Sequence, residues 1–248
     1  MKILIACATC HSYKYLGYHA DAPGGTRVKI IRETWKKLIP EGIDFKFFYG
    51  RGEGKPKDDE IFLDEADEFF AMPKKVRGIC KYAAEHNYDF MFECVDDVFM
   101  NVPLILKSDF ADYDYTGNAL NLGNSNVPFR FCSGFAVGYS RKAIEIVANA
   151  EVGWTNFDTE FDLQKYQQSD NVGKIKWHDD LWIGSVLSKS GITPHNDERF
   201  IIEIWSDIGN GPPSMYPLDN ALAVHVSPHV DFMYKLYEMC KIRGQAAI

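Results

Sequence analysis

The chain has 248 residues, of which 46% are hydrophobic and 14% aromatic, with 27 Lys and Arg against 35 Asp and Glu. This composition excludes an intrinsically disordered chain, which is poor in apolar residues, and it is sufficient to bury a core. The formal net charge of −8 argues against broad, non-specific binding to nucleic acid, because neutralising phosphates requires Lys and Arg. No apolar stretch approaches the length of a membrane span, and the N-terminus is predicted to be a core strand rather than a signal peptide.

Strand-like and helix-like segments alternate through the first 106 residues. Taken in chain order, the pattern predicts strands at 1–9, 44–49 and 88–95, interleaved with helices at 27–38, after Pro73 and at 103–106. Further along, it predicts strands at 113–117 and 131–139, and helices at 141–148, near 180–189 and at 231–243. The alternation predicts an α/β fold with a mixed, mostly parallel sheet flanked by helices. Without a repeat or a linker, we expect one domain over residues 1–248.

Six cysteines are scattered along the chain, several of them inside apolar runs where a thiol packs as a small hydrophobe. This usage leads us to expect a reducing, cytoplasmic setting. The Cys7-x-x-Cys10 spacing by itself is too weak a signal to predict a redox pair or a zinc site.

Two adjacent acidic residues, Asp96 and Asp97, follow the apolar strand at 88–95. Ligands of open α/β sheets bind outside the carboxyl ends of the strands, so the pair is expected to emerge into a cleft. Adjacent carboxylates repel each other unless a cation or hydrogen-bond donors compensate. The pair is therefore a candidate Mg²⁺ or Mn²⁺ site shared with substrate phosphates. The alternative is two solvated carboxylates in a turn.

A second acidic pair, Asp179-Asp180, precedes the helix predicted near 180–189. A helix N-terminus favours negative charge, so Asp179 is expected to serve as an N-cap. Asp180 becomes a candidate general base if it faces the cleft. His225 lies in an apolar strand-like segment, where a histidine is more often a hydrogen-bonded core residue than a ligand.

Several segments, in order, resemble the β-1,3-galactosyltransferase, N-acetylglucosaminyltransferase and Fringe-like glycosyltransferase family. The similar segments span roughly residues 1 to 235 and comprise Arg27-x-x-x-Ile31-Arg32-x-Thr34-Trp35, Phe47-Phe-Tyr-Gly50, Asp58-Asp-Glu-Ile61, Asp67-x-Phe69-x-x-Met72-Pro73-x-Lys75, Val95-Asp96-Asp97-Val98-Phe99-Met100-Asn101, Tyr115-x-Gly117, Ser133-Gly134-Phe-Ala-Val-Gly-Tyr-Ser140 and Asp179-Asp180-Leu181-x-x-Gly184. Each match is weak alone, and the specificity comes from the ordered set.

The resemblance implies a GT-A-type fold, a nucleotide-sugar donor, expected to be UDP-linked, a divalent metal, Mn²⁺ or Mg²⁺, and inversion at the sugar carbon. It also implies a nucleotide-sugar-binding half at 1–106 and an acceptor-binding and catalytic half at 107–248. The acceptor is expected to be a glycan or another hydroxyl compound.

The resemblance also implies roles for individual residues. Asp97 would be the direct metal ligand, Asp96 would serve the donor ribose or the metal, and Asp180 would be the general base. His225 would be the late metal-binding histidine, with His229 as the alternative.

Basic and polar residues of the matching segments are expected at the donor. Arg27, Arg32 and Lys75 would contact phosphates or base, and Thr9 would lie near the nucleotide; for Arg27 a structural ion pair is an equal alternative. Trp205, on a Gly- and Pro-rich segment, and Asp179 are expected at the acceptor rim.

The sequence departs from the family pattern at Val95, which replaces the first Asp of an Asp triplet. This departure motivates an alternative function, a sugar- or nucleotide-binding module that has lost turnover. A hydroxymethylated base in DNA is an alternative acceptor; the acidic total disfavours it, but Lys74, Lys75, Arg77 and Lys81 could form a basic cleft.

Overall fold

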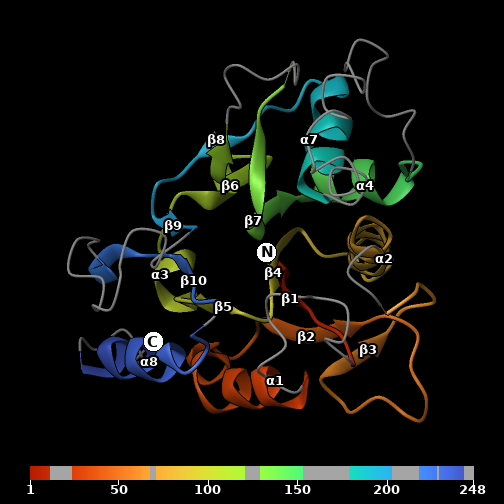
Figure 1. Ribbon diagram of the computed structural model, residues 1–248. Coiled ribbons are helices and arrows are strands. Elements are labelled where there is room, and N and C mark those ends of the chain that lie inside the picture. The colour runs from red at the N-terminus through yellow and green to blue at the C-terminus, as the bar shows by residue number, and fades with distance from the viewer. Residues whose placement is uncertain are drawn as a thin grey trace, which may run out of the picture.

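A seven-stranded sheet lies at the centre of the molecule (Figure 1). The computed structural model describes residues 1–11, 24–67, 71–120, 129–152, 179–202, 218–227 and 229–242. The strands of this sheet are β1 (Ile3–Ala8), β2 (Asp44–Tyr49), β3 (Glu60–Phe62), β4 (Phe90–Val95), β6 (Tyr115–Leu120), β7 (Phe131–Ser140) and β8 (His195–Asn196). They lie in the order β3-β2-β1-β4-β7-β6-β8.

The first four strands are mutually parallel, and β7 runs antiparallel to both of its neighbours. Strand β8 is parallel to β6. The predicted mixed, mostly parallel α/β sheet is therefore confirmed. Because β1 to β4 share one direction, their carboxyl ends meet at one edge of the sheet, which is the edge where open α/β sheets bind ligands.

Helices cover both faces of the sheet. They are α1 (Gly24–Glu33), α2 (Met72–Glu85), α3 (Val102–Leu106), α4 (Arg141–Asn149), α7 (Asp179–Lys189) and α8 (Phe232–Ile242), with short 3₁₀ helices η1 (Trp35–Leu38), η3 (Phe110–Asp112) and η5 (Leu218–Asn220). Figure 1 shows α2, α4 and α7 along one side and α1, α3 and α8 along the other. Within the described ranges, no helix combines the length and the apolar character that a membrane crossing requires.

Alternation along the strands divides the core into two layers, one on each face. In β1, Ile5 and Cys7 pack toward α1 and α8, whereas Leu4 and Ala6 pack toward α2 and α7. The same alternation in β4 places Phe92 in the first layer. A strand with both faces buried is apolar along nearly its whole length, which is why the sequence predicted β1 and β4.

A second, three-stranded sheet stands beside the first. It consists of β5 (Val98–Met100), β10 (Ala223–His225) and β9 (Phe200–Ile201), in that order. Strand β5 follows β4 after the two-residue turn of Asp96 and Asp97, and it pairs antiparallel with β10. The sequence pattern did not predict β5, β8 or β9, because strands of two or three residues show no measurable alternation.

The predicted helix at 27–38 is two helices. Helix α1 begins at Gly24 and ends at Glu33, and η1 begins at Trp35. Between them, Thr34 has φ −117° and ψ −113°, outside the helical region, and its hydroxyl donates a 2.6 Å hydrogen bond to the carbonyl of Ile30. Such back-bonding by a threonine hydroxyl bends helices.

Candidate functional site

The candidate site begins with Asp96 and Asp97 at the carboxyl end of β4. Both side chains are buried, with residue exposures of 4% and 6%. Buried carboxylates need partners, because leaving water costs several kcal/mol for an unpaired charge. The structure supplies partners from three distant segments of the chain.

The first partner comes from the end of β1. The hydroxyl of Thr9 donates a 2.6 Å hydrogen bond to Asp96 Oδ2. Lys75, on α2 and only 1% exposed, donates from Nζ to the Thr9 carbonyl at 2.8 Å and to Asp67 Oδ1 at 2.9 Å. The same Asp67 oxygen accepts the backbone N–H of Gly50, at the end of β2. Thr9 and Lys75 thus tie the ends of β1 and β2 and helix α2 to the Asp96 carboxylate.

The second partner is Arg27, in the first turns of α1. Its Nη1 lies 3.1 Å from Asp96 Oδ1 and 3.0 Å from Asp97 Oδ2, so one guanidinium nitrogen bridges the two carboxylates. Arg27 is itself buried, at 4% exposure. Of the two alternatives expected for this residue, the structural ion pair is the one present.

The third partner is His225, which the pairing of β10 with β5 brings to the site. His225 pairs with Val98, the residue that directly follows Asp97. The backbone N–H of Val226 donates to the Asp97 carbonyl at 2.9 Å. The register places His225 Nε2 3.4 Å from Asp97 Oδ1. His229, the alternative, lies after the strand, and its side chain is exposed.

The geometry around His225 suits a cation. Its Nδ1 lies 3.0 Å from the carbonyl oxygen of Ile202, which can only accept, so Nδ1 carries the hydrogen. Nε2 then lies on the side of Asp97 Oδ1, where a protonated ring forms an ion pair with the carboxylate and a neutral ring would share a cation with it. A carboxylate suits Mn²⁺ or Mg²⁺ and imidazole is a common metal ligand, so the two residues fit the metal that the resemblance implies.

Asp96 is held differently. Its Oδ2 accepts from Thr9 and its Oδ1 faces Arg27. Burial and the neighbouring Asp97 raise the pKa of Asp96, and the hydrogen bond from Thr9 opposes that rise. Among the described residues, no three His, Cys, Asp or Glu side chains are grouped so as to hold a metal ion. Of the three predicted ligands, Asp97 and His225 lie beside each other, and Arg27 contacts both Asp96 and Asp97.

The second acidic pair, Asp179 and Asp180, lies on the face of β7 opposite to His225. Helix α7 begins at Asp179, so both carboxylates lie in its first turn, and the cap position falls on residue 178, outside the described residues. A Cβ atom built on Gly134 would lie 3.2 Å from Asp179 Oδ2 and 3.4 Å from Asp180 Cβ. The neighbouring Phe135 ring lies 5.9 Å from the His225 ring. Adjacent residues of one strand thus contact the two halves of the candidate site.

Burial and the adjacent carboxylate of Asp180 raise the pKa of Asp179 to about 8. Asp179 therefore carries a proton at neutral pH and is uncharged. Asp180 lies beside it in the same helical turn, and its Oδ1 accepts the N–H of Leu181 at 2.8 Å.

A buried carboxyl group that the sequence analysis missed, Glu93, lies in the middle of β4. Glu93 has 0% exposure, and both of its oxygens lack a hydrogen-bond partner in the described structure. Its position between Phe92 and Cys94 turns it toward the α2 and α7 face, opposite to theirs. Burial, Asp179 and Asp180 raise its pKa well above the usual range. The sequence signal that could have revealed Glu93 is a single acidic residue within an apolar strand pattern.

The remaining predicted residues lie elsewhere. Arg32 pairs with Asp59 at 2.7 Å and Glu60 at 2.7 Å, beside β3, so its contact with a donor remains a prediction. Trp205 lies outside the described residues. Trp182 is buried in the core.

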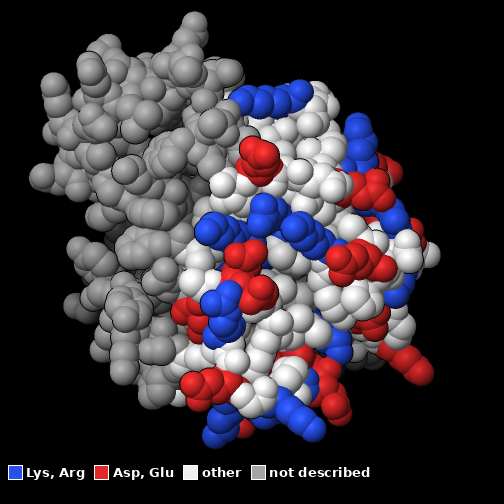
Figure 2. Space-filling model, turned by 90° about the vertical axis from the view of Figure 1, so that its right-hand side faces the viewer, with Lys and Arg blue, Asp and Glu red and all other residues white. Residues whose placement is uncertain are grey.

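Basic residues of α2 do not gather into a single-sign patch. Lys75 is paired with Asp67, and Arg77 lies 3.7 Å from Glu65, which leaves Lys74 and Lys81 exposed. Figure 2 shows acidic and basic side chains interspersed over the described part of this side of the molecule. A duplex acceptor would need a stronger positive field than this arrangement gives.

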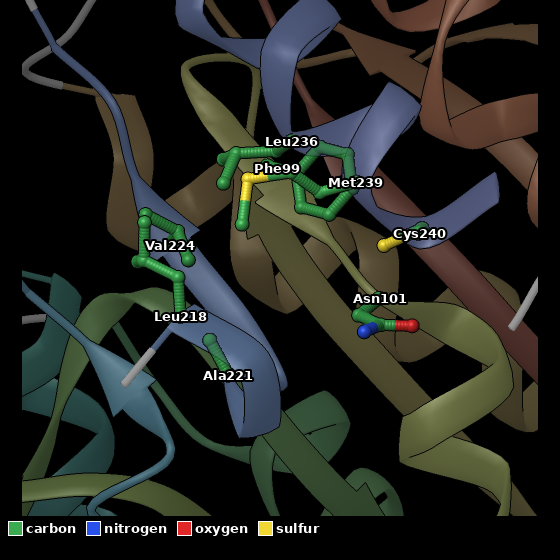
Figure 3. Close-up of a pocket in the computed structure, with 8 residues that line it drawn as sticks. All are labelled: Phe99, Asn101, Leu218, Ala221, Val224, Leu236, Met239 and Cys240. Carbon is green, nitrogen blue, oxygen red and sulfur yellow. The ribbon is translucent and has the colours of Figure 1, made fainter. Parts of the chain in front are cut away.

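A small apolar pocket lies between β5, β10 and α8 (Figure 3). Phe99 and Val224 line it, and they pair in the β5–β10 ladder. Because neighbours on a strand face opposite sides, His225 points away from this pocket. The pocket is therefore separate from the acidic site.

No family model and no curated protein matches the chain. One solved structure that it resembles is that of a glycosyltransferase involved in the glycosylation of the major capsid of PBCV-1. The two chains are 16% identical, the match covers 96% of this chain and 100% of that chain, and the TM-score is 0.45. A likeness of this size assigns no activity to this chain.

Proposed function

We propose that the protein is a glycosyltransferase that moves a sugar from a nucleotide-sugar donor, expected to be UDP-linked, to an acceptor hydroxyl with inversion. The observation that carries the proposal is the position of β7: a Cβ atom built on Gly134 would lie 3.2 Å from Asp179 Oδ2, and the ring of the neighbouring Phe135 lies 5.9 Å from that of His225, which faces Asp97. In the proposed reaction, Asp97 and His225 would hold the cation, and Asp180 would be the base. The ordered sequence motifs of the family fall on the same residues.

The chemistry needs one base and a centre that tolerates negative charge on the departing group. In the proposed reaction, the acceptor oxygen attacks the anomeric carbon, and the bond from that carbon to the diphosphate oxygen breaks on the opposite face. The hydroxyl proton passes to the carboxylate of Asp180. No covalent intermediate is required, which agrees with a site that has a single candidate base.

A divalent cation, Mn²⁺ or Mg²⁺, would be held by Asp97 and His225, with Asp96 beside them, and would stabilise charge on the diphosphate. Thr9 borders this centre and would lie nearest the nucleotide. Lys75 is buried beneath Thr9, so we propose that it acts by fixing the end of β1 rather than by contacting the donor.

The proposal is tested first at the level of binding. A panel of nucleotide sugars, each with and without Mn²⁺, is screened by thermal shift, because a ligand of the folded state raises the melting temperature by mass action. We expect one nucleotide class to raise the melting temperature in the presence of Mn²⁺. The rise should be smaller in Asp97→Asn and as large as in the wild type in the exposed control Asp112→Asn. A flat response to every donor would contradict the proposal.

The screen also separates the binding-module alternative. A donor that shifts the melting temperature and yet is never cleaved or transferred, with any acceptor class tested, would favour a module that has lost turnover. Release of the nucleoside diphosphate that depends on Asp180 would favour the enzyme.

A further inference from the structure

The four oxygens of Asp96 and Asp97 are divided among three partners. Thr9 takes Asp96 Oδ2, and His225 faces Asp97 Oδ1 at 3.4 Å. The two remaining oxygens, Asp96 Oδ1 and Asp97 Oδ2, both face Nη1 of Arg27, at 3.1 and 3.0 Å. The guanidinium therefore takes the position between the carboxylates, which is where an ion bound by both would have to lie.

We propose that Arg27 is a resident cation between Asp96 and Asp97, and that a divalent ion must displace its guanidinium before both carboxylates can bind. This inference rests on the proposed function only in naming the metal centre. It accounts for the position of Arg27, a cation of the chain itself, between two predicted metal ligands, Asp96 and Asp97.

The physical reason lies in burial and charge. Arg27, Asp96 and Asp97 are all at most 6% exposed, so each carboxylate needs a counter-charge whenever the metal is absent. The planar guanidinium can bridge two carboxylates and is always charged. The same bridge lowers metal affinity, because the ion must replace hydrogen bonds to charged groups, which are among the stronger ones in proteins.

The test is a titration with Mn²⁺ alone, in which free ion is followed by electron paramagnetic resonance and no donor or acceptor is present. We expect Arg27→Gln to bind Mn²⁺ about tenfold more tightly than the wild type, or more. Folding of each variant is checked by circular dichroism. If Arg27→Gln does not fold, Arg27→Lys, which keeps a charge but loses the planar fork, takes its place with a smaller gain expected.

Removal of a positive charge alone would also tighten binding, so the test is completed as a double-mutant cycle with Asp96→Asn. If Arg27 acts by withholding the two carboxylates, the gain from Arg27→Gln becomes clearly smaller in the Asp96→Asn background, where only Asp97 is left to be released. A gain of undiminished size there would overturn the proposal in favour of simple charge repulsion. Unchanged or weaker binding by Arg27→Gln, or no Mn²⁺ binding by any variant, would also overturn it.

The outcome is independent of sugar transfer. Competition between Arg27 and Mn²⁺ with no transfer to any acceptor would leave this inference standing and remove the proposed function. Sugar transfer without competition between Arg27 and Mn²⁺ would leave the proposed function standing and remove this inference.

Discussion

Thr9 donates a 2.6 Å hydrogen bond to Asp96 across a separation of 87 residues. The contact joins the ends of two adjacent parallel strands, β1 and β4, which carry the candidate site. It also connects Asp96, through the Thr9 carbonyl, to Lys75 and Asp67. The acidic site is therefore anchored to the edge of the sheet, and the effect of each substitution depends on which connection it breaks.

Replacing Thr9 by Val removes the hydroxyl and keeps the shape of the side chain. Asp96 Oδ2 would lose its buried donor, so we expect the free energy of unfolding to fall by about 1–3 kcal/mol. Urea denaturation measures the change. Thr9→Ser retains the hydroxyl and should lose less; an equal loss in both variants would show that the hydrogen bond is not the cause.

Gly134→Ala tests the contact between β7 and the start of α7. The new Cβ would lie 3.2 Å from Asp179 Oδ2, tight enough to move the acidic pair. We expect kcat to fall about tenfold or more, since small displacements of catalytic groups are costly, while donor affinity is retained. Gly78→Ala is the matched control, because its Cβ would meet only the Leu63 side chain, also at 3.2 Å. Equal activity of both variants would contradict the placement of the base beside Gly134.

Glu93→Gln tests the buried carboxyl of β4. Its pKa is raised in the folded protein above the ordinary 4.5, so the folded state keeps a proton that the unfolded chain releases. Wild-type stability should therefore fall as pH rises above about 4.5, by up to about 1.4 kcal/mol per pH unit, until the folded-state pKa is reached. Urea denaturation of both proteins at about pH 5 and about pH 8 should show Glu93→Gln gaining relative to the wild type. The exposed substitution Glu85→Gln should show no such trend, and a constant difference for Glu93→Gln would exclude a protonated Glu93.

Asp59 has the opposite dependence. Burial opposes its ionisation, but hydrogen bonds from Arg32 and Lys36 outweigh that effect and lower its pKa from 3.8 to about 2. Its contribution to stability is complete above about pH 5 and is lost as pH falls from about 4 towards 2. Denaturation of the wild type and Asp59→Asn should show a difference at about pH 6 that shrinks by about pH 3. A difference that stays constant over this range would show that the ion pairs do not stabilise the fold.

Long elements with strong periodicity were predictable from the sequence. Strand β4 is apolar except for Glu93, and α2, which has Pro73 in its first turn, carries Val76, Ile79 and Ala83 on its buried side. The acidic pair at the end of β4 followed from the same pattern. The division of the segment 27–38 at Thr34 did not, because the apolar spacing continues through the break.

The partners within the site depend on contacts that no local pattern contains. Asp96 and Asp97 lie 69 and 70 residues from Arg27. The position of His225 beside Asp97 rests on the register of β10 against β5, where His225 pairs with Val98. Short strands without a periodic signal determine that register. The resemblance to a family could therefore suggest His225 as a candidate ligand, but its position beside Asp97 follows only from the fold.

The central claim, that Asp180 takes the acceptor proton in a sugar transfer, is tested most directly by the rate of nucleoside-diphosphate release. The wild type, Asp180→Asn and the control Asp112→Asn are compared at saturating donor with the acceptor that supports transfer. We expect Asp180→Asn to bind the donor as the wild type does and to release the diphosphate at least about 100-fold more slowly. A rate for Asp180→Asn within a few-fold of the wild type, at equal donor binding, would contradict the assignment.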